Sequence, residues 1–319
     1  MNPQERPWNH SVFTVGEREE GLRAEEFLAL ALPHLSRSRI RQKIQQGESL
    51  LNSRRYATSA RLAAGDVVEV LWRDLGTGGG EARISVLYED EFLLAVDKPA
   101  GMAVHPAGAV QSGTLIQLVR SRFRGVVESR LLRGDRGAAL NLIHRLDRLT
   151  SGVVLVAKDK ATHDAFQRLL AGDGMEKRYV AVVEGIVEPY DGTIDRPIGP
   201  SDGPIRVRMA VREDGRPSVT RYRTLRRGAD CTALQAWPVT GRQHQIRVHF
   251  ASIGHPVVGD LLYKDPDLFL RALAGERDPS LPQRHLLHAE SLSFRHPCTD
   301  ARLEIVSPIP PEFLPPFAD

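Results

Sequence analysis

The first part of the chain shows two helical patterns of hydrophobic residues followed by a strand pattern. Apolar residues recur on one broad face over residues 24–35 and again over 36–48, where Ile40 and Ile44 lie one helical turn apart. Residues 65–72, GDVVEVLW, are rich in valine and begin with a Gly-Asp turn pair, as is typical of a strand. The pattern predicts a small, compact N-terminal module.

Strand patterns outnumber helical patterns in the rest of the chain, and many neighbouring segments are joined by short turns. This mixture predicts an α+β domain built on a mostly antiparallel or mixed sheet. We expect strands within residues 84–99 and over 151–159, 177–185, 232–239, 289–294 and 302–306. We expect helices over residues 113–123, 160–171 and 242–254.

A glycine-rich segment separates the two patterns. The sequence RDLGTGGGEAR, residues 73–83, places four glycines within five positions, which is typical of a flexible linker. With 319 residues, the chain is long enough for one large domain and one small domain. The sequence therefore predicts a module over 18–72, a linker over 73–83 and a larger domain over 84–319.

The charged residues point to a polyanionic partner. The net charge is only +3, but the basic residues are nearly all arginine, which favours bidentate contacts with phosphate. A GC-rich coding bias would also explain this excess. The second helical pattern contains Arg37, Arg39, Arg41 and Lys43, with no acid before Glu48. Such a cluster either binds a phosphate backbone or forms a solvated face, and its place in a tethered module favours binding of RNA or DNA.

Cysteine content and hydropathy limit the setting in which the protein works. Cys231 and Cys298 lie far apart and lack metal-ligand spacing, which fits a reducing, cytoplasmic setting. The first residues, MNPQERPWNH, contain no apolar run, so we expect no signal peptide. No stretch of about 18 apolar residues occurs, so we expect no contact with a membrane.

Several histidines raise the alternative of a metal site. His244 and His249 are five residues apart, so they point away from each other on either a helix or a strand. His285 and His288 could share a helical face, but their segment has a strand pattern. Because neither the histidines nor the cysteines show known zinc spacing, we expect no metal and regard the histidines as structural hydrogen-bonding residues.

The segment HRLDRLTSG, residues 144–152, places a single acid, Asp147, between Arg145 and Arg148. An acid/base pair of the glycosidase kind needs two carboxyl groups, and a metal site needs more ligands than one. The segment on its own does not explain why a lone carboxylate lies between two cations.

A second polar segment, GRQHQIRVH at residues 241–249, is typical of a basic wall of a site. If residues 243–249 form a helix, Gln243 and Arg247 lie on one face, one turn apart. An Arg directed inward could pair with an inward Asp. Tyr179 lies among apolar strand residues, and on its own it is more typical of a hydrophobic core than of a site.

Taken in order, these segments resemble the RluA/RluD-type family of pseudouridine synthases over nearly the whole chain. Their order and spacing match those of the family. The N-terminal module is similar to the S-four RNA-binding domain, also called the alpha-L fold. The segments that carry the resemblance are DKPAGMAVHP (97–106), HRLDRLTSGVVLVAK (144–158), KRYVAVVEG (177–185), GRQHQIRVHFASIGHPVVGDLLY (241–263) and LLHAESLSFRHP (286–297).

The resemblance implies an enzyme that isomerises uridine in structured RNA to pseudouridine, with a single catalytic Asp and no cofactor. That residue is Asp147, and a lone carboxylate suffices because the reaction consumes no water. The resemblance also implies that Tyr179 packs on the base and takes the proton from its carbon, and that Arg247 pairs with Asp147. It places substrate contacts at His144, Arg145, Thr150, Ser151, Arg242 and Gln245.

Two residues depart from the family pattern. Leu149 stands where many relatives have an acid, and Gln243 stands where many have Thr. Both flank the implied site and replace none of the three residues implied in catalysis, so they bear on substrate choice rather than on chemistry.

The implied partner is RNA, and large-subunit ribosomal RNA is favoured over transfer RNA, because family members with this N-terminal module lean that way. We expect a monomer. Two alternatives stay open: a non-catalytic RNA-binding protein or RNA chaperone, and a metal-dependent hydrolase that uses the histidines. The intact set of Asp147, Tyr179 and Arg247 speaks against the first, and metal analysis of the purified protein would test the second.

Overall fold

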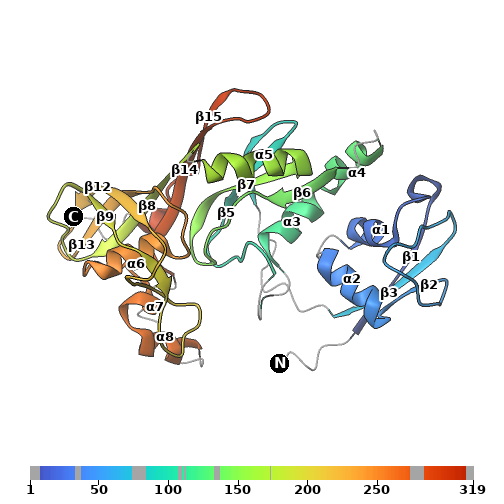
Figure 1. Ribbon diagram of the computed structural model, residues 1–319, viewed down its shortest axis with the longest axis horizontal. Helices are drawn as coiled ribbons and strands as arrows, with labels where there is room; N and C mark the ends of the chain where they lie inside the picture. The colour runs from blue at the N-terminus through green and yellow to red at the C-terminus, as the bar shows by residue number, and fades with distance from the viewer. Residues whose placement is uncertain are drawn as a thin grey trace. The chain divides into compact units, whose positions relative to one another are not determined.

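The computed structural model describes residues 8–32, 37–73, 84–106, 110, 113–132, 137–172, 174–273 and 284–313 (Figure 1). The chain divides into two compact units. Unit 1 comprises Met1–Ile84, Ala103–Asn141 and Lys158–Lys160, and unit 2 comprises Ser85–Met102, Leu142–Ala157 and Ala161–Asp319. Asp147, Tyr179 and Arg247 all belong to unit 2.

The N-terminal part of unit 1 is a three-stranded antiparallel sheet, in the order β1-β3-β2, that packs against two helices. Phe27, Leu28, Ile40 and Ile44 on the helices are buried with Val68 on β3. This packing confirms the helices and the strand predicted from the apolar pattern, whereas β1 and β2 were not predicted. The elements are β1 (Trp8–Thr14), η2 (Glu17–Glu19), α1 (Ala24–Ala31), α2 (Arg37–Gln46), β2 (Ser49–Leu51) and β3 (Val67–Arg73).

The predicted linker lies almost wholly outside the described residues, since only Arg73 and no residue from 74 to 83 is described. The boundary between 18–72 and 84–319 therefore stays a prediction. The separate core of residues 15–70 agrees with it. Unit 1 also contains α3 (Leu115–Arg122), which confirms the helix predicted over 113–123, together with α4 (Arg124–Leu132) and most of β6 (Ala138–Leu142).

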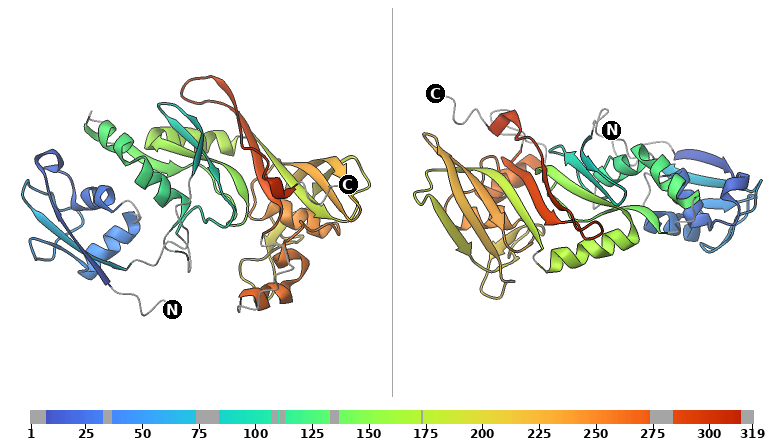
Figure 2. Two further views of the ribbon diagram at one scale, coloured as in Figure 1. Left: turned by 180° about the vertical axis from the view of Figure 1, so that it is seen from behind. Right: turned by 90° about the horizontal axis from the view of Figure 1, so that it is seen from above.

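Unit 2 is built on a long, mixed sheet (Figure 2). Its strands follow the order β4-β5-β7-β14-β8-β13-β12-β9, and β15 pairs with β14. The β7–β14 pair is parallel and the other pairs are antiparallel, which confirms the predicted α+β, mostly antiparallel class. The strands are β4 (Ser85–Glu89), β5 (Leu93–Lys98), β7 (Ser151–Asp159), β8 (Met175–Glu184), β9 (Asp191–Asp195), β12 (Val219–Arg227), β13 (Cys231–Pro238), β14 (Leu287–Arg295) and β15 (Arg302–Val306).

Among the described elements, α-helices and one 3₁₀ helix pack on the sheet. Phe166 of α5 (Lys160–Ala171) packs on β7 and β14, and α5 runs along the sheet in Figure 2. Ile246 and Phe250 of α6 (Gln245–Ser252) pack on the face of β8 that carries Ala181 and Val183. The alternate residues of β8 face the other side, where they contact Phe313 of η3 (Pro311–Phe313). Elsewhere unit 2 contains the hairpin β10 (Ile198–Pro200) and β11 (Met209–Val211), α7 (Leu261–Lys264) and α8 (Pro266–Leu273).

Strand β12 was not predicted, because its buried face is not aliphatic. Thr220, Tyr222 and Thr224 point into the protein, while Arg221 and Arg223 between them are exposed. The alternation is that of a strand, but threonine and arginine gave the segment a polar appearance.

Candidate active site

The loop that leads into β7 carries Asp147. The backbone N–H of Thr150 donates to the carbonyl of Asp147 at 3.1 Å, which closes a tight turn. The Asp147 side chain is 27% exposed, so a bound ligand can reach the carboxylate.

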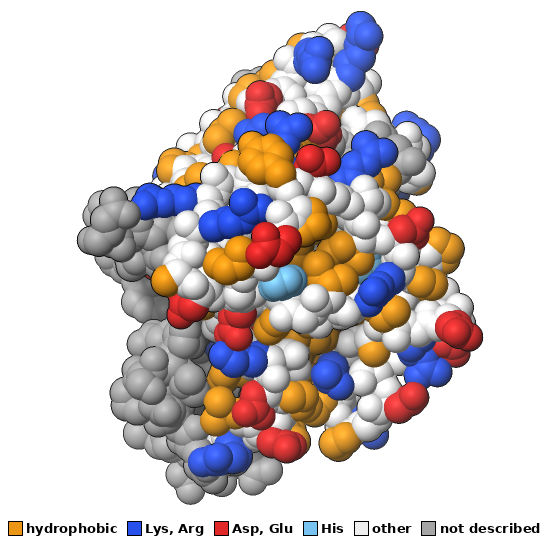
Figure 3. Space-filling model, turned by 90° about the vertical axis from the view of Figure 1, so that its left-hand side faces the viewer, with side chains coloured by type: hydrophobic (Ala, Val, Ile, Leu, Met, Phe, Trp, Pro, Cys, Tyr) orange, Lys and Arg blue, Asp and Glu red, His pale blue; other side chains and the backbone are white. Residues whose placement is uncertain are grey.

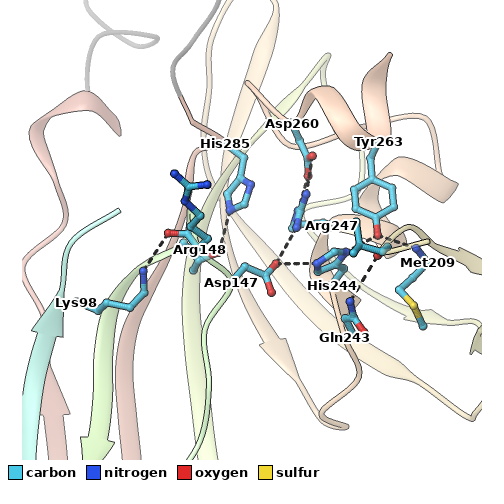
Figure 4. Close-up of polar contacts among 12 residues, drawn as sticks. Lys98, Asp147, Arg148, Met209, Gln243, His244, Arg247, Asp260, Tyr263 and His285 are labelled. Atoms are coloured by element: carbon cyan, nitrogen blue, oxygen red, sulfur yellow. Dashed lines mark hydrogen bonds and ion pairs between the residues drawn. The ribbon is translucent and has the colours of Figure 1, made fainter. Parts of the chain in front are cut away.

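Arg247 on α6 lies between Asp147 and a second acid, Asp260 (Figure 4). Its Nη1 donates to Oδ2 of Asp147 at 2.8 Å, while Nε and Nη2 donate to the two oxygens of Asp260 at 2.6 and 2.8 Å. The side chains of Arg247 and Asp260 are only 7% and 1% exposed. Two carboxylates thus share one guanidinium, so the group of three retains a net negative charge.

Burial on its own lowers the pKa of Arg247, because a charged group is poorly solvated in the interior. The hydrogen bonds and charges of Asp260 and Asp147 outweigh this effect, and the pKa of Arg247 is raised. The guanidinium is therefore a permanent cation beside Asp147. Its fixed orientation follows from the bidentate bond to Asp260.

His244 and Tyr263 complete the surroundings of Asp147. Nε2 of His244 lies 3.7 Å from Oδ2 of Asp147, and Nδ1 lies 2.8 Å from the hydroxyl of Tyr263. The guanidinium of Arg247 lies over the ring of Tyr263, 5.0 Å from its centre. His244 directly precedes α6 and has a left-handed backbone with φ of 56°.

Lys98, at the end of β5, ties the loop to the sheet. Its ammonium donates to the carbonyls of Pro99 and Met102 at 2.9 Å and to that of Arg148 at 3.2 Å. Burial lowers the pKa of Lys98 to about 7, and the negative charge of Asp147 opposes this shift. Three carbonyl acceptors match the three protons of the charged ammonium.

Thr150 and Ser151 fasten the other end of the loop. The hydroxyl of Thr150 lies 2.8 Å from Nε2 of His285, and that of Ser151 lies 2.9 Å from Nδ1 of His288. Arg284 donates to the same Ser151 hydroxyl at 2.9 Å. These partners come from the start of β14 and the segment just before it, so distant parts of the chain hold the loop in place.

Gly152 allows β7 and β14 to approach closely after this loop. It pairs with Ala289 and has a φ of 116°, a conformation that other residues rarely adopt. A Cβ atom at this position would lie 2.1 Å from the carbonyl oxygen of Ala289. The glycine is therefore required by the geometry that places Asp147.

Tyr179 lies on β8, between β13 and β14. Its ring packs at the edge of the core beneath α6 and is half-buried. Burial raises the pKa of Tyr179, and the charge of Asp147 raises it further, so the phenol is neutral at physiological pH.

Comparisons with known proteins show the family of the chain. The family model described as RNA pseudouridylate synthase matches residues 92–252. The "Ribosomal large subunit pseudouridine synthase D" of Xanthomonas campestris is 36% identical over 309 residues, which cover 93% of this chain and 88% of the relative. The chain belongs to the RNA pseudouridylate synthase family.

Two further relatives extend the match. An "Uncharacterized RNA pseudouridine synthase YlyB" of Bacillus subtilis is 33% identical, with 95% of each chain covered. The solved structure "Human RNA Pseudouridylate Synthase Domain Containing 1" is 28% identical with a TM-score of 0.57, covering 72% of this chain and 85% of that one. The pseudouridine synthase fold expected from the resemblance is thereby confirmed.

Four of the residues expected to contact substrate are two arginines at the surface and two hydroxyl residues that hold the loop. Arg145 is exposed and Arg242 partly so, and Arg242 donates to the carbonyl of Pro217 at 3.1 Å. Thr150 and Ser151 hold the loop as described above. Contact of these four residues with a substrate stays a prediction.

His144 and Gln245 have hydrogen-bond partners within the protein, and their contact with substrate stays a prediction. Nε2 of His144 accepts a hydrogen bond from the backbone of Leu155 at 3.2 Å, and burial lowers its pKa to about 3. The buried Gln245 side chain accepts from Thr240 and donates to the carbonyl of Val219. Both side chains are thus engaged within the protein and support neighbouring backbone.

The helix expected over 242–254 begins later. The structure starts α6 at Gln245, and the left-handed backbone of His244 separates Gln243 from the helix. Gln243 and Arg247 therefore do not share a helical face. Gln243 is exposed and donates to the carbonyl of Val207 at 3.5 Å.

Two of the four cations predicted on α2 have acidic partners in the module. Lys43 is buried and donates to Glu48 at 2.8 Å. Arg41 pairs with Glu25 on α1, an acid that is distant in sequence. Arg37 is exposed, whereas the side chain of Arg39 lies outside the described residues. Arg37 is therefore the described cation of this set that is best placed for RNA.

The end of unit 2 that carries β9, β12 and β13 has mixed charge. Among the described residues on the face in Figure 3, basic and acidic side chains are interspersed. Arg223 of β12 lies opposite Asp191 of β9, and both side chains are exposed. The described residues of this face therefore do not form a continuous basic surface of the kind that binds a phosphate backbone.

Sequence reasoning missed Asp260, Tyr263 and Lys98. All three lie within segments that carry the family resemblance, but no local spacing connects them to Asp147. Turns fold the chain back between α6 and α7, and only the folded chain shows that Asp260 meets Arg247.

Within the described part of the chain, no group of three or more His, Cys, Asp or Glu side chains could hold a metal ion. No described helix has the length and hydropathy needed to cross a membrane.

We expect the synthase to retain its activity after exhaustive treatment with EDTA. The reason is that its described residues offer no ligand cluster for zinc. The assay would use a short RNA that folds without divalent ions, and untreated enzyme would be the control. Loss of activity that zinc restores would contradict this prediction.

Proposed function

We propose that the protein isomerises specific uridines of large-subunit ribosomal RNA to pseudouridine, with Asp147 as the reacting group. The relatives named ribosomal large subunit pseudouridine synthase D support the choice of RNA. Transfer RNA is the alternative substrate. The cytoplasmic location and the monomeric state stay predictions.

The single observation that carries the role of Asp147 is its position. It is a partly exposed carboxylate, held on one oxygen by a buried cation whose own orientation is fixed by Asp260. A carboxylate that is charged, reachable and fixed in direction suits a nucleophile or a base.

The reaction needs only one such group. The bond between N1 of uracil and C1′ of ribose breaks, the base rotates, and C5 forms the new bond to C1′. C5 loses its proton and N1 gains one, so no water is consumed. A second carboxyl group to activate water, as glycoside hydrolysis uses, is therefore unnecessary.

We propose that Tyr179 packs against the base and relays the C5 proton: its hydroxyl oxygen accepts this proton while it passes its own proton to solvent, since the phenol is neutral. Its half-buried position on β8 and the influence of the Asp147 charge on its pKa support a place near the reacting base. A uridine within folded RNA must first leave its stack, at a cost of a few kcal/mol that phosphate contacts and stacking can offset.

Residues 18–72 are proposed to be an S-four-type RNA-binding domain that anchors the enzyme on its RNA. The separate core of this module and the exposed Arg37 support the proposal. Tethering would raise the local concentration of the catalytic domain without adding contacts at the active site.

The test of the substrate is base-resolution mapping of pseudouridine in total RNA from cells with and without this gene. We expect positions in large-subunit ribosomal RNA to lose the modification. Loss confined to transfer RNA would reject the ribosomal substrate and keep the isomerase, and loss at no uridine would reject both.

We expect the double substitution Arg37→Glu/Arg39→Glu to weaken binding to ribosomal RNA and to flatten its salt dependence. Each lost phosphate contact should lower the slope of log affinity against log salt by about one unit. The matched control is Arg221→Glu/Arg223→Glu, which reverses two exposed charges on the mixed-charge face of β12. Equal effects in the two variants would reject a specific anchoring role for α2.

A further inference from the structure

The two oxygens of the Asp147 carboxylate have different surroundings. Arg247 and His244 both approach Oδ2, at 2.8 and 3.7 Å. No described residue donates a hydrogen bond to Oδ1. One oxygen is therefore held by the protein, and the other is available to a ligand.

The proton on His244 is directed by Tyr263. The backbone N–H of Met209 donates to the Tyr263 hydroxyl at 3.1 Å, so this oxygen already accepts one hydrogen bond. The hydroxyl oxygen lies 2.8 Å from Nδ1 of His244, so Tyr263 can donate its own proton to that nitrogen (Figure 4). If Tyr263 donates to Nδ1, the neutral imidazole carries its proton on Nε2, the nitrogen that faces Asp147.

The opposite tautomer fits this geometry poorly. With the proton on Nδ1, the lone pair of Nε2 would face the carboxylate of Asp147, and two acceptors would repel each other. The Tyr263 hydroxyl would then accept two hydrogen bonds, and its own proton would lack a described acceptor. Burial also lowers the pKa of His244, which agrees with a neutral ring.

The backbone of His244 shows that its place is imposed by the surroundings. A φ of 56° is uncommon for a residue other than glycine, although Asn, Asp and His adopt it more readily than most. Such conformations persist where the surrounding structure requires them, and they cluster at functional sites.

We propose that His244 is a positioning residue for Asp147: its Nε2–H, directed by the Tyr263 hydroxyl, joins Arg247 in holding Oδ2, so that Oδ1 is the oxygen that reacts with the substrate. The present separation of 3.7 Å exceeds a hydrogen bond, and such bonds in active sites often tighten only when the substrate is bound. The inference rests on the proposed role of Asp147 as the reacting group.

Two substitutions at His244 distinguish this role from one in which the residue matters only because it adopts the left-handed backbone. In His244→Gln the amide nitrogen lies near the position of Nε2 and can still reach Asp147. In His244→Asn it lies near the position of Nδ1 and cannot, although Asn fits the left-handed backbone better. We expect His244→Asn to lower kcat by about tenfold with little change in KM, and His244→Gln to stay within about threefold of the native enzyme.

A backbone role predicts the reverse order, with Asn better tolerated than Gln, and that result would overturn the proposal. Equal, native-like activity of both variants would also overturn it. If Asp147→Asn retained activity, the proposed function of Asp147 would fail instead, whatever the His244 variants do.

The tautomer is measured directly by ¹⁵N NMR of the full chain labelled on histidine, with the His244→Gln spectrum identifying the resonances of His244. We expect the Nε2–H form at neutral pH, and a mixture of tautomers in Tyr263→Phe. A native His244 in the Nδ1–H form or in the charged form would overturn the proposal, even if a variant failed to fold.

Discussion

Asp147→Asn is expected to abolish uridine isomerisation while leaving affinity for RNA nearly unchanged. The substitution keeps the size of the side chain and removes the negative charge that the reaction requires. Removal of a reacting group of this kind lowers turnover by about 10⁴-fold or more. Release of tritium from RNA labelled at C5 of uridine measures turnover, and a filter-binding titration of the same RNA measures affinity.

The matched control is Asp164→Asn, which removes the same charge from α5 in the same unit. It should behave as the native enzyme in both assays. Retained turnover in Asp147→Asn would reject Asp147 as the reacting group. A parallel loss of RNA affinity would instead indicate that this carboxylate serves binding.

Arg247→Met is expected to lower both activity and the free energy of unfolding. The change leaves the Asp260 carboxylate, which is 1% exposed, without its bidentate partner. Breaking a buried pair by removing one partner costs about 3–5 kcal/mol, whereas Asp147 is partly exposed and can be solvated. Urea unfolding measures the loss of stability, and tritium release measures the loss of activity.

A second substitution separates these two losses. Arg247→Met/Asp260→Asn removes the stranded charge as well, so most of the stability should return. Activity should not return, because Asp147 still lacks the cation that holds it. Recovery of activity together with stability would mean that Arg247 matters only as the neutralising partner of Asp260.

The sequence predicted elements best where local signals agreed. Helix α5 begins at Lys160 and ends at Ala171, the bounds expected from the sequence. Strand β7 is buried along its whole length, so its continuous apolar run was sufficient. Strand β12 escaped prediction because threonine and tyrosine form its buried face.

The candidate site was likewise predicted only in part. Asp147, Arg247 and Tyr179 were found through the family resemblance, and the pairing of Asp147 with Arg247 was expected. Asp260 was not found, because its meeting with Arg247 depends on the turn between α6 and α7 rather than on spacing along one element. For the same reason the sequence could not show that Arg41 meets Glu25 across two helices.

The fit of Gly152 against Ala289 limits how this enzyme could be re-engineered. No side chain fits at position 152, so the Asp147 loop and β14 can be exchanged between enzymes only as one piece. Changes of target specificity therefore have to come from positions whose side chains are not packed against the rest of the protein. Arg145 on the exposed side of the loop is such a position, whereas Arg148 donates to the carbonyl of Gly101. A library built at position 145 could explore new RNA targets without disturbing the carboxylate.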